Sequence, residues 1–385
     1  MNKPKYVTKL DHVVGLSEAE RQELAPVSEK FVFRANDYYL NLIDWDDPED
    51  PIRRLVIPDA SELSDWGRLD ASHEELYTKA PGLEHKYRDT ALLLCNDVCG
   101  AYCRYCFRKR LFMDDNDEVV KDVQPGLNYI RQHPEINNVL LTGGDPLIMS
   151  TSKLEPIVAQ LREIPHVKII RIGSKMPAFN PHRILHDEAL HAMLRKYSTP
   201  EQGRIYVMCH FNHPRELTDE ARASLDVLQR NGATTINQTP LIRGINDDVE
   251  TLRELFGDLS YLGVPPYYVF HCRPTEGNEA YSMPVEEGFR IFLAAQQRTS
   301  GLARRARYSM SHVTGKIEVV ALTPENVILR YHRAASAQNE GRTLVFKRNP
   351  EAQWFDDYAE AVAYLPELPA ASRLVSIESD LASRA

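Results

Sequence analysis

The residues of this chain best suited to chemistry are three cysteines at a C-x3-C-x2-C spacing. Cys99, Cys103 and Cys106 follow an apolar run at 91–94 that predicts a buried strand. A loop that leaves this strand can curl so that three sulfur atoms point at one centre. Thiolates suit soft metals and hold most iron–sulfur clusters. The spacing therefore predicts a metal or cluster site.

Two other interpretations compete with a cluster, namely a zinc site and buried structural thiols. Structural zinc needs four ligands, and no cysteine or histidine lies close downstream of Cys106 to supply the fourth. A [4Fe–4S] cluster held by three cysteines leaves one iron open for a non-protein ligand. The spacing resembles the signature of the radical S-adenosylmethionine (SAM) superfamily. In that superfamily the open iron binds the amino and carboxylate groups of SAM.

A second motif, Gly143–Gly144–Asp145, follows the next predicted strand. Two glycines allow the backbone to approach a ligand closely. The alternative is a plain turn from a strand to a helix. Radical SAM enzymes bind the SAM amino group one strand after the cluster loop, so we interpret this motif as part of a SAM site.

Polar residues also follow the third, fourth and fifth predicted strands. They are Arg171 to Lys175 (with Ser174), Cys209 to His213 (with His210) and Asn237–Gln238. Any one of them could be a satisfied loop residue, and for His213 that alternative is favoured. Their recurrence at successive strand ends favours a binding site for the ribose, carboxylate or adenine of SAM.

Two basic residues could act on a substrate or a cofactor. Arg108 lies two residues after the last cysteine, where it could balance the cluster charge or pair bidentately with a substrate carboxylate. Lys316 follows Thr314–Gly315 and is a candidate for a Schiff base. The run Arg304–Arg307 is either a solvated face or part of an anion site.

Length and composition limit the class of protein. The chain has 385 residues, a formal net charge of −9 and 43% hydrophobic residues, which leaves room for an α/β barrel with appendages. The acidic balance argues against a general nucleic-acid binder. No long apolar stretch or signal-peptide core is present, so we expect no membrane span and a cytoplasmic location. Cys95, Cys209 and Cys272 are expected to be core residues rather than disulfide partners.

Strand and helix patterns alternate from about residue 88. Six βα units in sequence predict a parallel sheet, which when curved gives a partial (β/α)6 TIM-type barrel of the α/β class. Such a barrel carries its active site at the C-terminal ends of its strands. The predicted strands are Thr90–Cys95, Asn138–Thr142, Lys168–Gly173, Arg204–Cys209, Thr234–Gln238 and Tyr267–His271.

Two further regions flank the barrel, which we place at residues 86–305. Residues 1–85 are expected to be helical, with a first helix that begins at a capping box of Ser17 and Glu20. Residues 306–385 are expected to form a small β-rich unit that covers the barrel mouth or pairs with another subunit. Its predicted elements are the strands Lys316–Leu322, Asn326–His332 and Arg342–Lys347, and a helix at Trp354–Ala363.

Residues 33 to 300 resemble the lysine 2,3-aminomutase family. The similarity is carried by the cluster loop, Leu140–Leu–Thr–Gly–Gly–Asp145, Arg171–Ile–Gly–Ser174, His210–Phe–Asn–His213 and Arg243–Gly–Ile–Asn–Asp247. It implies SAM cleavage to a 5′-deoxyadenosyl radical and migration of an amino group between adjacent carbons. It also implies that pyridoxal phosphate (PLP) holds the migrating nitrogen as an imine.

The resemblance also assigns roles by position. It places the cluster on the three cysteines and the PLP at Lys316. It places the substrate α-carboxylate at Arg108, so Arg108 and Lys316 are the candidate catalytic residues. The SAM site would be lined by Gly143, Gly144, Asp145, Ser174, His210 and Gln238.

The chain departs from the family pattern around the substrate and PLP. Lys86 and Thr90 stand where the family has two arginines that hold the PLP phosphate, and a single Gly315 replaces a glycine run before Lys316. Arg273 stands where lysine mutases have an aspartate for the distal ammonium. An arginine repels an ammonium and attracts an anion. We therefore expect an amino-acid substrate other than lysine, with Arg273 binding an anionic side chain.

Two alternatives to a PLP-dependent 2,3-aminomutase stay open. One is a radical SAM isomerase, epimerase or hydrogen-abstracting enzyme without PLP, and the other is a non-catalytic cluster or zinc protein. The expected partners are a small-molecule substrate and an external one-electron reductant of the flavodoxin or ferredoxin type. A homo-oligomer is compatible with the sequence, and neither nucleic acid nor a membrane is expected.

Overall fold

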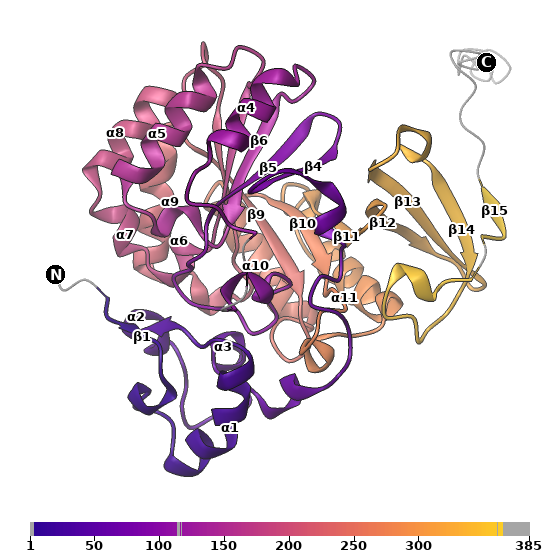
Figure 1. Cartoon of the computed structure of the whole chain (residues 1–385). Coiled ribbons are helices and arrows are strands. Elements are labelled where there is room, and N and C mark those ends of the chain that lie inside the picture. Colours follow the sequence, from indigo (N-terminus) through magenta and orange to yellow (C-terminus); the bar gives the residue numbers. More distant parts are fainter. Residues whose placement is uncertain (1–3, 114–115, 117, 360, 365–385) are drawn as a thin grey trace, which may run out of the picture.

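A computed structural model of the chain describes residues 4–113, 116, 118–359 and 361–364. Most strands belong to one continuous sheet in which each strand pairs with the next along the chain (Figure 1). Its members are β3 (Thr78–Ala80), β4 (Leu83–Tyr87), β5 (Thr90–Asn96), β6 (Asn138–Gly143), β7 (Ile169–Ser174), β8 (Ile205–Cys209), β9 (Thr234–Leu241), β10 (Pro266–His271), β11 (Arg307–His312), β12 (Gly315–Leu322), β13 (Asn326–Ala334), β14 (Thr343–Lys347) and β15 (Ala363–Tyr364).

The strands β5 to β11 run parallel and curve into a partial barrel, as predicted. Helices between them cover the outer face (Figure 1), because each crossover between parallel strands needs a helix that packs back onto the sheet. The principal helices are α4 (Gln124–Gln132), α5 (Thr151–Arg162), α8 (Glu188–Tyr197), α9 (Asp219–Arg230), α10 (Val249–Tyr261) and α11 (Val285–Gln297). Shorter helices are α6 (Met176–Phe179) and α7 (His182–Leu185).

All six predicted barrel strands are confirmed, but the structure adds a seventh parallel strand, β11, which pairs with β10. Its sequence, Arg–Tyr–Ser–Met–Ser–His, is short and carries only two apolar side chains, Tyr308 and Met310, at alternate positions. The polar side chains between and after them are largely buried too, including Ser309 and His312. Two apolar positions are a weak signal for a strand that is buried on both faces.

The N-terminal region packs beneath the cluster loop. Its helices are α1 (Glu18–Lys30), α2 (Asp37–Leu40) and α3 (Pro51–Val56), and a short sheet joins β1 (Tyr6–Val7) to β2 (Ala35–Asn36). The predicted capping box of Ser17 and Glu20 is confirmed. Buried side chains from this region share one apolar core with Ala101 and Tyr105 of the cluster loop. The region ends in β3 and β4, an antiparallel pair that joins the edge of the barrel sheet.

The C-terminal unit continues the same sheet as the antiparallel strands β12 to β15. Its three predicted strands are confirmed, but the predicted helix at Trp354–Ala363 is wrong. A 3₁₀ turn at Phe355–Asp357 and the strand β15 stand there instead. The ring of Trp354 packs against His271 of β10, whereas that of Phe355 packs against Tyr331 and Phe346 of the β unit, and one face of a helix cannot supply both contacts. The polar tail at 365–385 lies outside the described residues.

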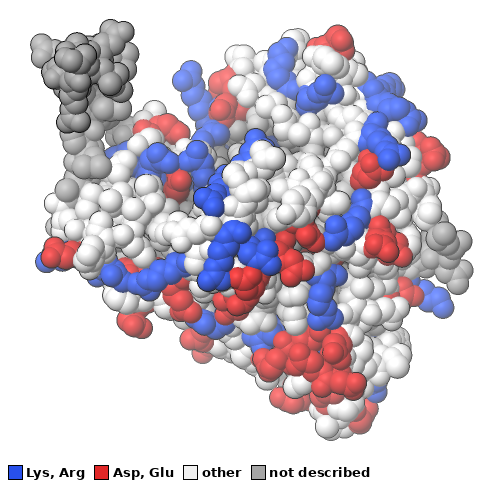
Figure 2. Space-filling view, turned by 180° about the vertical axis from the view of Figure 1, so that it is seen from behind, with Lys and Arg blue, Asp and Glu red and all other residues white. Residues whose placement is uncertain are grey.

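Charged side chains are unevenly distributed over the surface of the molecule. Figure 2 shows acidic side chains gathered at the lower end of one face, with lysines and arginines distributed above them. In the described part of the chain, no helix combines the length and the apolar character needed to cross a membrane.

Candidate active site

One cavity of about 320 Å³ occupies the inside of the barrel. Its volume lies in the range typical of small-molecule sites. The cavity brings together the residues to which the family resemblance gives a role at the cluster, SAM, PLP or substrate, although these residues come from seven strands and their loops. Those lining it are Cys99, Cys103, Cys106, Arg108, Gly143, Gly144, Asp145, Ser174, His210, Gln238, Arg273 and Lys316.

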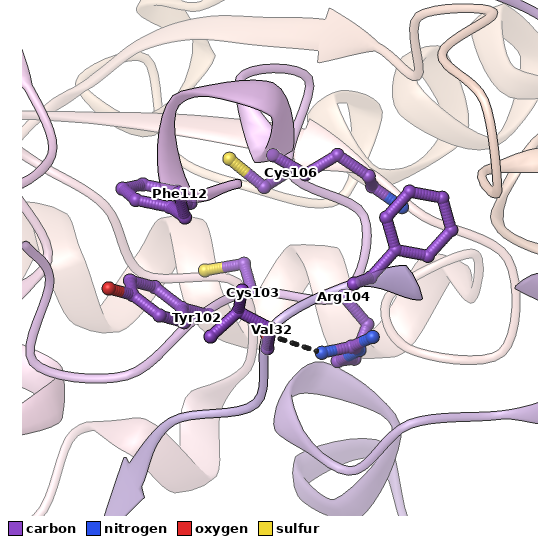
Figure 3. Close-up of a pocket in the computed structure, with 8 residues that line it drawn as sticks. Val32, Tyr102, Cys103, Arg104, Cys106 and Phe112 are labelled. Atoms are coloured by element: carbon purple, nitrogen blue, oxygen red, sulfur yellow. Dashed lines mark hydrogen bonds between the residues drawn. The ribbon is translucent and has the colours of Figure 1, made fainter. Parts of the chain in front are cut away.

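The three cysteines of the loop after β5 are free thiols. Figure 3 shows the sulfur atoms of Cys103 and Cys106 on the same side of the loop, near the stacked rings of Tyr102 and Phe112. Burial raises the pKa of Cys99 well above its ordinary value and that of Cys103 to about 12. Such thiols ionise when a metal binds them. The donor set therefore fits a soft metal centre.

A cluster distributes its cysteines over several metal atoms. Among the residues that the structure describes, no three His, Cys, Asp or Glu side chains are placed to hold one metal ion. In a [4Fe–4S] site each cysteine binds a different iron, so the sulfurs need not converge on a single point. Three free thiols on one cavity wall fit this requirement.

The N-terminal region fixes the backbone of the cluster loop. Arg34 Nε donates to the carbonyl oxygen of Cys99 at 2.9 Å, and Asn36 Nδ2 donates to that of Gly100 at 3.1 Å. Arg104 forms a buried bidentate pair with Glu62 at 2.9 and 2.8 Å. These contacts hold the loop in place independently of any metal.

The Gly143–Gly144–Asp145 motif supports the start of the same loop. Gly144 N donates to Asn96 O at 2.5 Å, and Asp145 N donates to Val98 O at 2.9 Å. A Cβ at Gly144 would lie 2.5 Å from Val98 O, and Gly143 has a positive φ of 106°. Both positions therefore require glycine because two backbones meet there.

Asp145 and Ser174 connect the ends of β6 and β7. The Asp145 carboxylate accepts from Ser174 Oγ at 3.0 Å and from the backbone N–H groups of Leu147, Lys175 and Met176 at 2.7–3.1 Å. Burial raises its pKa to about 6, while these hydrogen bonds act in the opposite direction. Ser174 and Asp145 thus shape the cavity wall where a SAM site is expected.

A buried ammonium stabilises the wall beside His210. Lys175 Nζ donates to Glu216 Oε1 at 2.6 Å and to the carbonyl oxygen of His210 at 2.9 Å. Burial, and next the charge of Lys175, lowers the pKa of His210 well below its ordinary value. His210 is therefore neutral at pH 7, and one ring nitrogen can accept a hydrogen bond. Gln238, on β9, presents an amide to the same cavity.

Arg108 belongs to a buried network of carboxylates and guanidinium groups. Its Nε and Nη2 donate to Glu74 at 2.9 and 3.0 Å, and Nη2 also donates to Glu84 at 3.2 Å. Its Nη1 donates to Thr142 Oγ1 at 3.1 Å. Burial, followed by the charge of Glu74, raises the pKa of Glu84 to about 8. The Nε and Nη2 atoms of Arg108 are thus paired with carboxylates. Its Nη1 atom is bonded only to the hydroxyl of Thr142 on β6.

Arg273, just after β10, is less completely paired. Its guanidinium lies 3.5 Å from the ring centroid of Phe107, and its nearest carboxylate, on Glu74, is 3.7 Å away. Its Nη1 is buried and makes no hydrogen bond to a described residue. Burial lowers the pKa of Arg273. This guanidinium nitrogen therefore has a donor that the described residues leave unused and that an anionic ligand could accept from.

Lys316 lies on β12 with its ammonium 4.5 and 4.4 Å from the ring centroids of Tyr268 and Phe270. Burial, together with the positive charges of Arg273 and Arg171, lowers the pKa of Lys316 well below its ordinary value. Among the described residues no carboxylate pairs with it. Its amine therefore loses its proton more easily than that of an exposed lysine, which favours a nucleophile for an aldehyde.

Three further residues line the cavity although nothing in the sequence marks them as site residues, namely Glu74, Glu84 and Arg333. Glu74 and Glu84 lie in the polar N-terminal region, and none of the three belongs to a motif. Arg333 comes directly after the predicted strand at 326–332 and lies on the longer observed strand β13. Arg333 could have been found only by pairing the two predicted strands, which brings it opposite the candidate Schiff-base residue Lys316. The run Arg304–Arg307 lies outside the cavity instead, since Arg304 is exposed and Arg307 pairs with Glu318 at 2.9 Å.

Known proteins with similar sequences are aminomutases by name. A putative L-lysine 2,3-aminomutase of Aquifex aeolicus is 60% identical over 94% of this chain and 96% of its own. The L-lysine 2,3-aminomutase of Clostridium subterminale is 38% identical over 78% of this chain and 71% of its own. The glutamate 2,3-aminomutase of Clostridioides difficile is 35% identical over 77% of this chain and 69% of its own.

Other comparisons are less informative. No protein-family model matches the sequence. A radical SAM methyltransferase from Sphaerobacter thermophilus aligns over 59% of this chain and 68% of its own, at 18% identity and a TM-score of 0.38, which is too low to support an argument. The A. aeolicus relative extends over nearly the whole chain, and the other two over more than three quarters of it. The chain therefore belongs to the lysine 2,3-aminomutase family of radical SAM isomerases.

Proposed function

We propose that this enzyme is a PLP-dependent 2,3-aminomutase that acts on an amino acid with an anionic side chain. The observation that carries the substrate class is Arg273, whose buried Nη1 lacks an acceptor on the cavity wall. The C. difficile relative, which is named a glutamate 2,3-aminomutase, supports an anionic substrate. An oxygen of a side-chain carboxylate would supply the missing acceptor.

Cys99, Cys103 and Cys106 would hold the cluster, and the walls formed by Gly144, Ser174, His210 and Gln238 would line the SAM site. A reduced cluster with SAM supplies a primary carbon radical that can abstract hydrogen from the substrate. The protein has to orient the reactants and exclude water, because a misplacement of about 1 Å can cost roughly a hundredfold in rate. An external one-electron reductant would complete the system.

Arg108 would bind the substrate α-carboxylate through the side of its guanidinium that is not paired with Glu74. Glu74 and Glu84 fix the orientation of this guanidinium before substrate arrives. A preorganised donor loses little conformational entropy on binding. The cavity wall therefore offers two separate anion sites, Arg108 and Arg273, and two carboxylates on one substrate would satisfy both.

Lys316 would hold PLP covalently. A deprotonated lysine amine is the group that can bind an aldehyde covalently, so Lys316 would be the attachment point of the cofactor. Bound there, PLP would supply the conjugated system that delocalises an unpaired electron next to the migrating nitrogen. The aromatic rings of Tyr268 and Phe270 keep the lysine dry and leave its amine facing the cavity.

The test is an anaerobic assay of the reconstituted protein with SAM, PLP and dithionite. Glutamate, aspartate and lysine are supplied separately, and the β-amino products are separated by chromatography. We expect a β-amino acid from glutamate or aspartate, 5′-deoxyadenosine from SAM, and a borohydride-trapped pyridoxyl group on Lys316. Turnover of lysine alone would refute the anionic substrate class.

A PLP-independent isomerase is the second candidate, favoured by Lys86 and Thr90 in place of the expected phosphate-binding arginines. The same assay separates the two functions. Formation of 5′-deoxyadenosine without any pyridoxyl group on Lys316, and with activity unchanged by Lys316→Ala, would support this second candidate and exclude the first.

A further inference from the structure

Lys316 and Arg333 face each other across two neighbouring strands. They are register partners on the antiparallel strands β12 and β13. Directly opposed residues of an antiparallel pair project from the same face of the sheet, with Cβ atoms about 5 Å apart. Both side chains line the barrel cavity. A guanidinium therefore stands beside the lysine that would bind PLP.

Arg171 enters the same part of the cavity from β7. Its Nε donates to Asn138 Oδ1 at 2.8 Å, and no described residue accepts from its Nη1 or Nη2 or forms an ion pair with it. Burial lowers the pKa of Arg171, and the charge of Arg333 lowers it further. The two guanidinium groups line the same cavity and repel each other, and Asp89 offsets this repulsion only in part because its ion pair is with Arg333.

The pair lies at the opposite end of the barrel from the cysteines. Arg171 bonds to Asn138, the first residue of β6, and Arg333 Nη2 donates to Asp89, just before β5, at 2.6 Å. The cysteines instead follow the C-terminal end of β5. A cofactor attached to Lys316 could thus direct an anionic substituent away from the cluster and keep its reactive carbon near the substrate.

We propose that Arg171 and Arg333 bind the phosphate group of PLP, an inference that rests on the proposed function. A phosphate monoester carries nearly two negative charges and three acceptor oxygens, which suit two guanidinium groups. In this chain the two arginines would replace the pair that the family resemblance expects at Lys86 and Thr90. Arg333 contributes its Nη1, because Nη2 is held by Asp89.

The other cations of the cavity are less suited to this role. Lys86 Nζ donates to the carbonyl oxygen of His312 at 2.5 Å and lies over the ring of Tyr77. Arg273 stacks on Phe107 near the cluster loop. Both cations are therefore directed toward other partners, and Arg171 keeps two nitrogens without a described acceptor.

The experiment compares PLP with pyridoxal, which carries the same aldehyde but no phosphate. Binding to the anaerobically purified, cluster-containing protein is measured by the absorbance change on attachment and by borohydride trapping at Lys316, without any turnover. The variants are Arg171→Gln, Arg333→Gln and the more conservative Arg171→Lys and Arg333→Lys. Arg330→Gln is the control, because Arg330 lies on the same strand but pairs with Glu318 outside the cavity.

We expect the wild-type protein and Arg330→Gln to prefer PLP over pyridoxal. Each Gln variant should bind PLP about tenfold or more weakly and bind pyridoxal as before, since it loses a charge-assisted hydrogen bond. The Arg171→Lys and Arg333→Lys variants should lose less affinity for PLP than the Gln variants, because they keep the positive charge. A preference for PLP that persists in all four variants would overturn the phosphate site alone. A wild-type protein that attaches neither aldehyde at Lys316 would overturn the proposed PLP chemistry itself.

Discussion

Glu74 holds Arg108 through two hydrogen bonds, at 2.9 Å to Nε and 3.0 Å to Nη2, and the side chains of this pair are 10% and 6% exposed. Glu74 also accepts from Arg110 at 2.9 Å. One carboxylate thus neutralises two buried guanidinium groups and lies 3.7 Å from a third, on Arg273. The orientation of the proposed carboxylate-binding arginine depends on a residue of the N-terminal region.

Glu74→Gln should strongly destabilise the protein. The substitution leaves Arg108 and Arg110 buried without their shared counter-ion, and breaking a buried ion pair from one side typically costs about 3–5 kcal/mol. Urea denaturation measures the loss. Glu118→Gln is the control, because Glu118 also pairs with Arg110 but is 32% exposed, and it should cost about 1 kcal/mol or less. Equal effects of the two substitutions would contradict this account.

Lys316→Met should raise the melting temperature of the PLP-free protein at pH 7. The folded-state pKa of Lys316 lies below its unfolded value of about 10.4, so burial of this amine opposes folding at neutral pH. This penalty shrinks as the pH rises toward the unfolded pKa, and the advantage of the variant should shrink with it. A methionine also packs well against Tyr268 and Phe270.

The control for this comparison is Lys347→Met, at an exposed position of β14, which should change stability by less than about 0.5 kcal/mol. A Lys316→Met variant that is less stable than wild type at pH 7 would show that the buried amine does not oppose folding.

Gly144→Ala should reduce iron incorporation. The new Cβ would lie 2.5 Å from Val98 O, so the backbone that leads into Cys99 has to move, at a cost of about 1–3 kcal/mol. Iron per chain and the visible absorbance of the cluster measure the effect. Gly257→Ala, on α10, meets no atom closer than 4.0 Å and should leave the iron content unchanged. Full iron content in Gly144→Ala would show that the loop tolerates the shift.

Arg273→Gln should raise the KM for the anionic substrate about tenfold or more and change kcat little, because the bond to a remote carboxylate is the same in the ground and transition states. Steady-state kinetics under anaerobic conditions measure both constants. Arg304→Gln, at an exposed arginine outside the cavity, should leave the KM as it is. An unchanged KM in Arg273→Gln would remove Arg273 from the substrate site.

The sequence by itself was enough to predict the barrel and its cofactor loop. Six strands and the capping box at Ser17 could be located because their patterns are local, as are the cysteine spacing and the glycine pair. Strand β11 could not, because a short segment with two apolar residues gives too weak a signal. The segment after Trp354 was wrongly predicted as a helix because its contacts are with distant strands.

The tertiary structure alone decided what surrounds the reacting groups. Glu74 meets Arg108 across 34 positions, and Arg333 meets Asp89 across 244. Ion pairs of this kind depend on distances in space, which no spacing along the chain encodes. Lys316 is an example of this difference between sequence and structure. The sequence shows that position 316 is a lysine after a glycine. The surroundings that lower the pKa of its amine exist only in the fold, because the rings of β10 bury the amine and cations from distant parts of the chain lie near it.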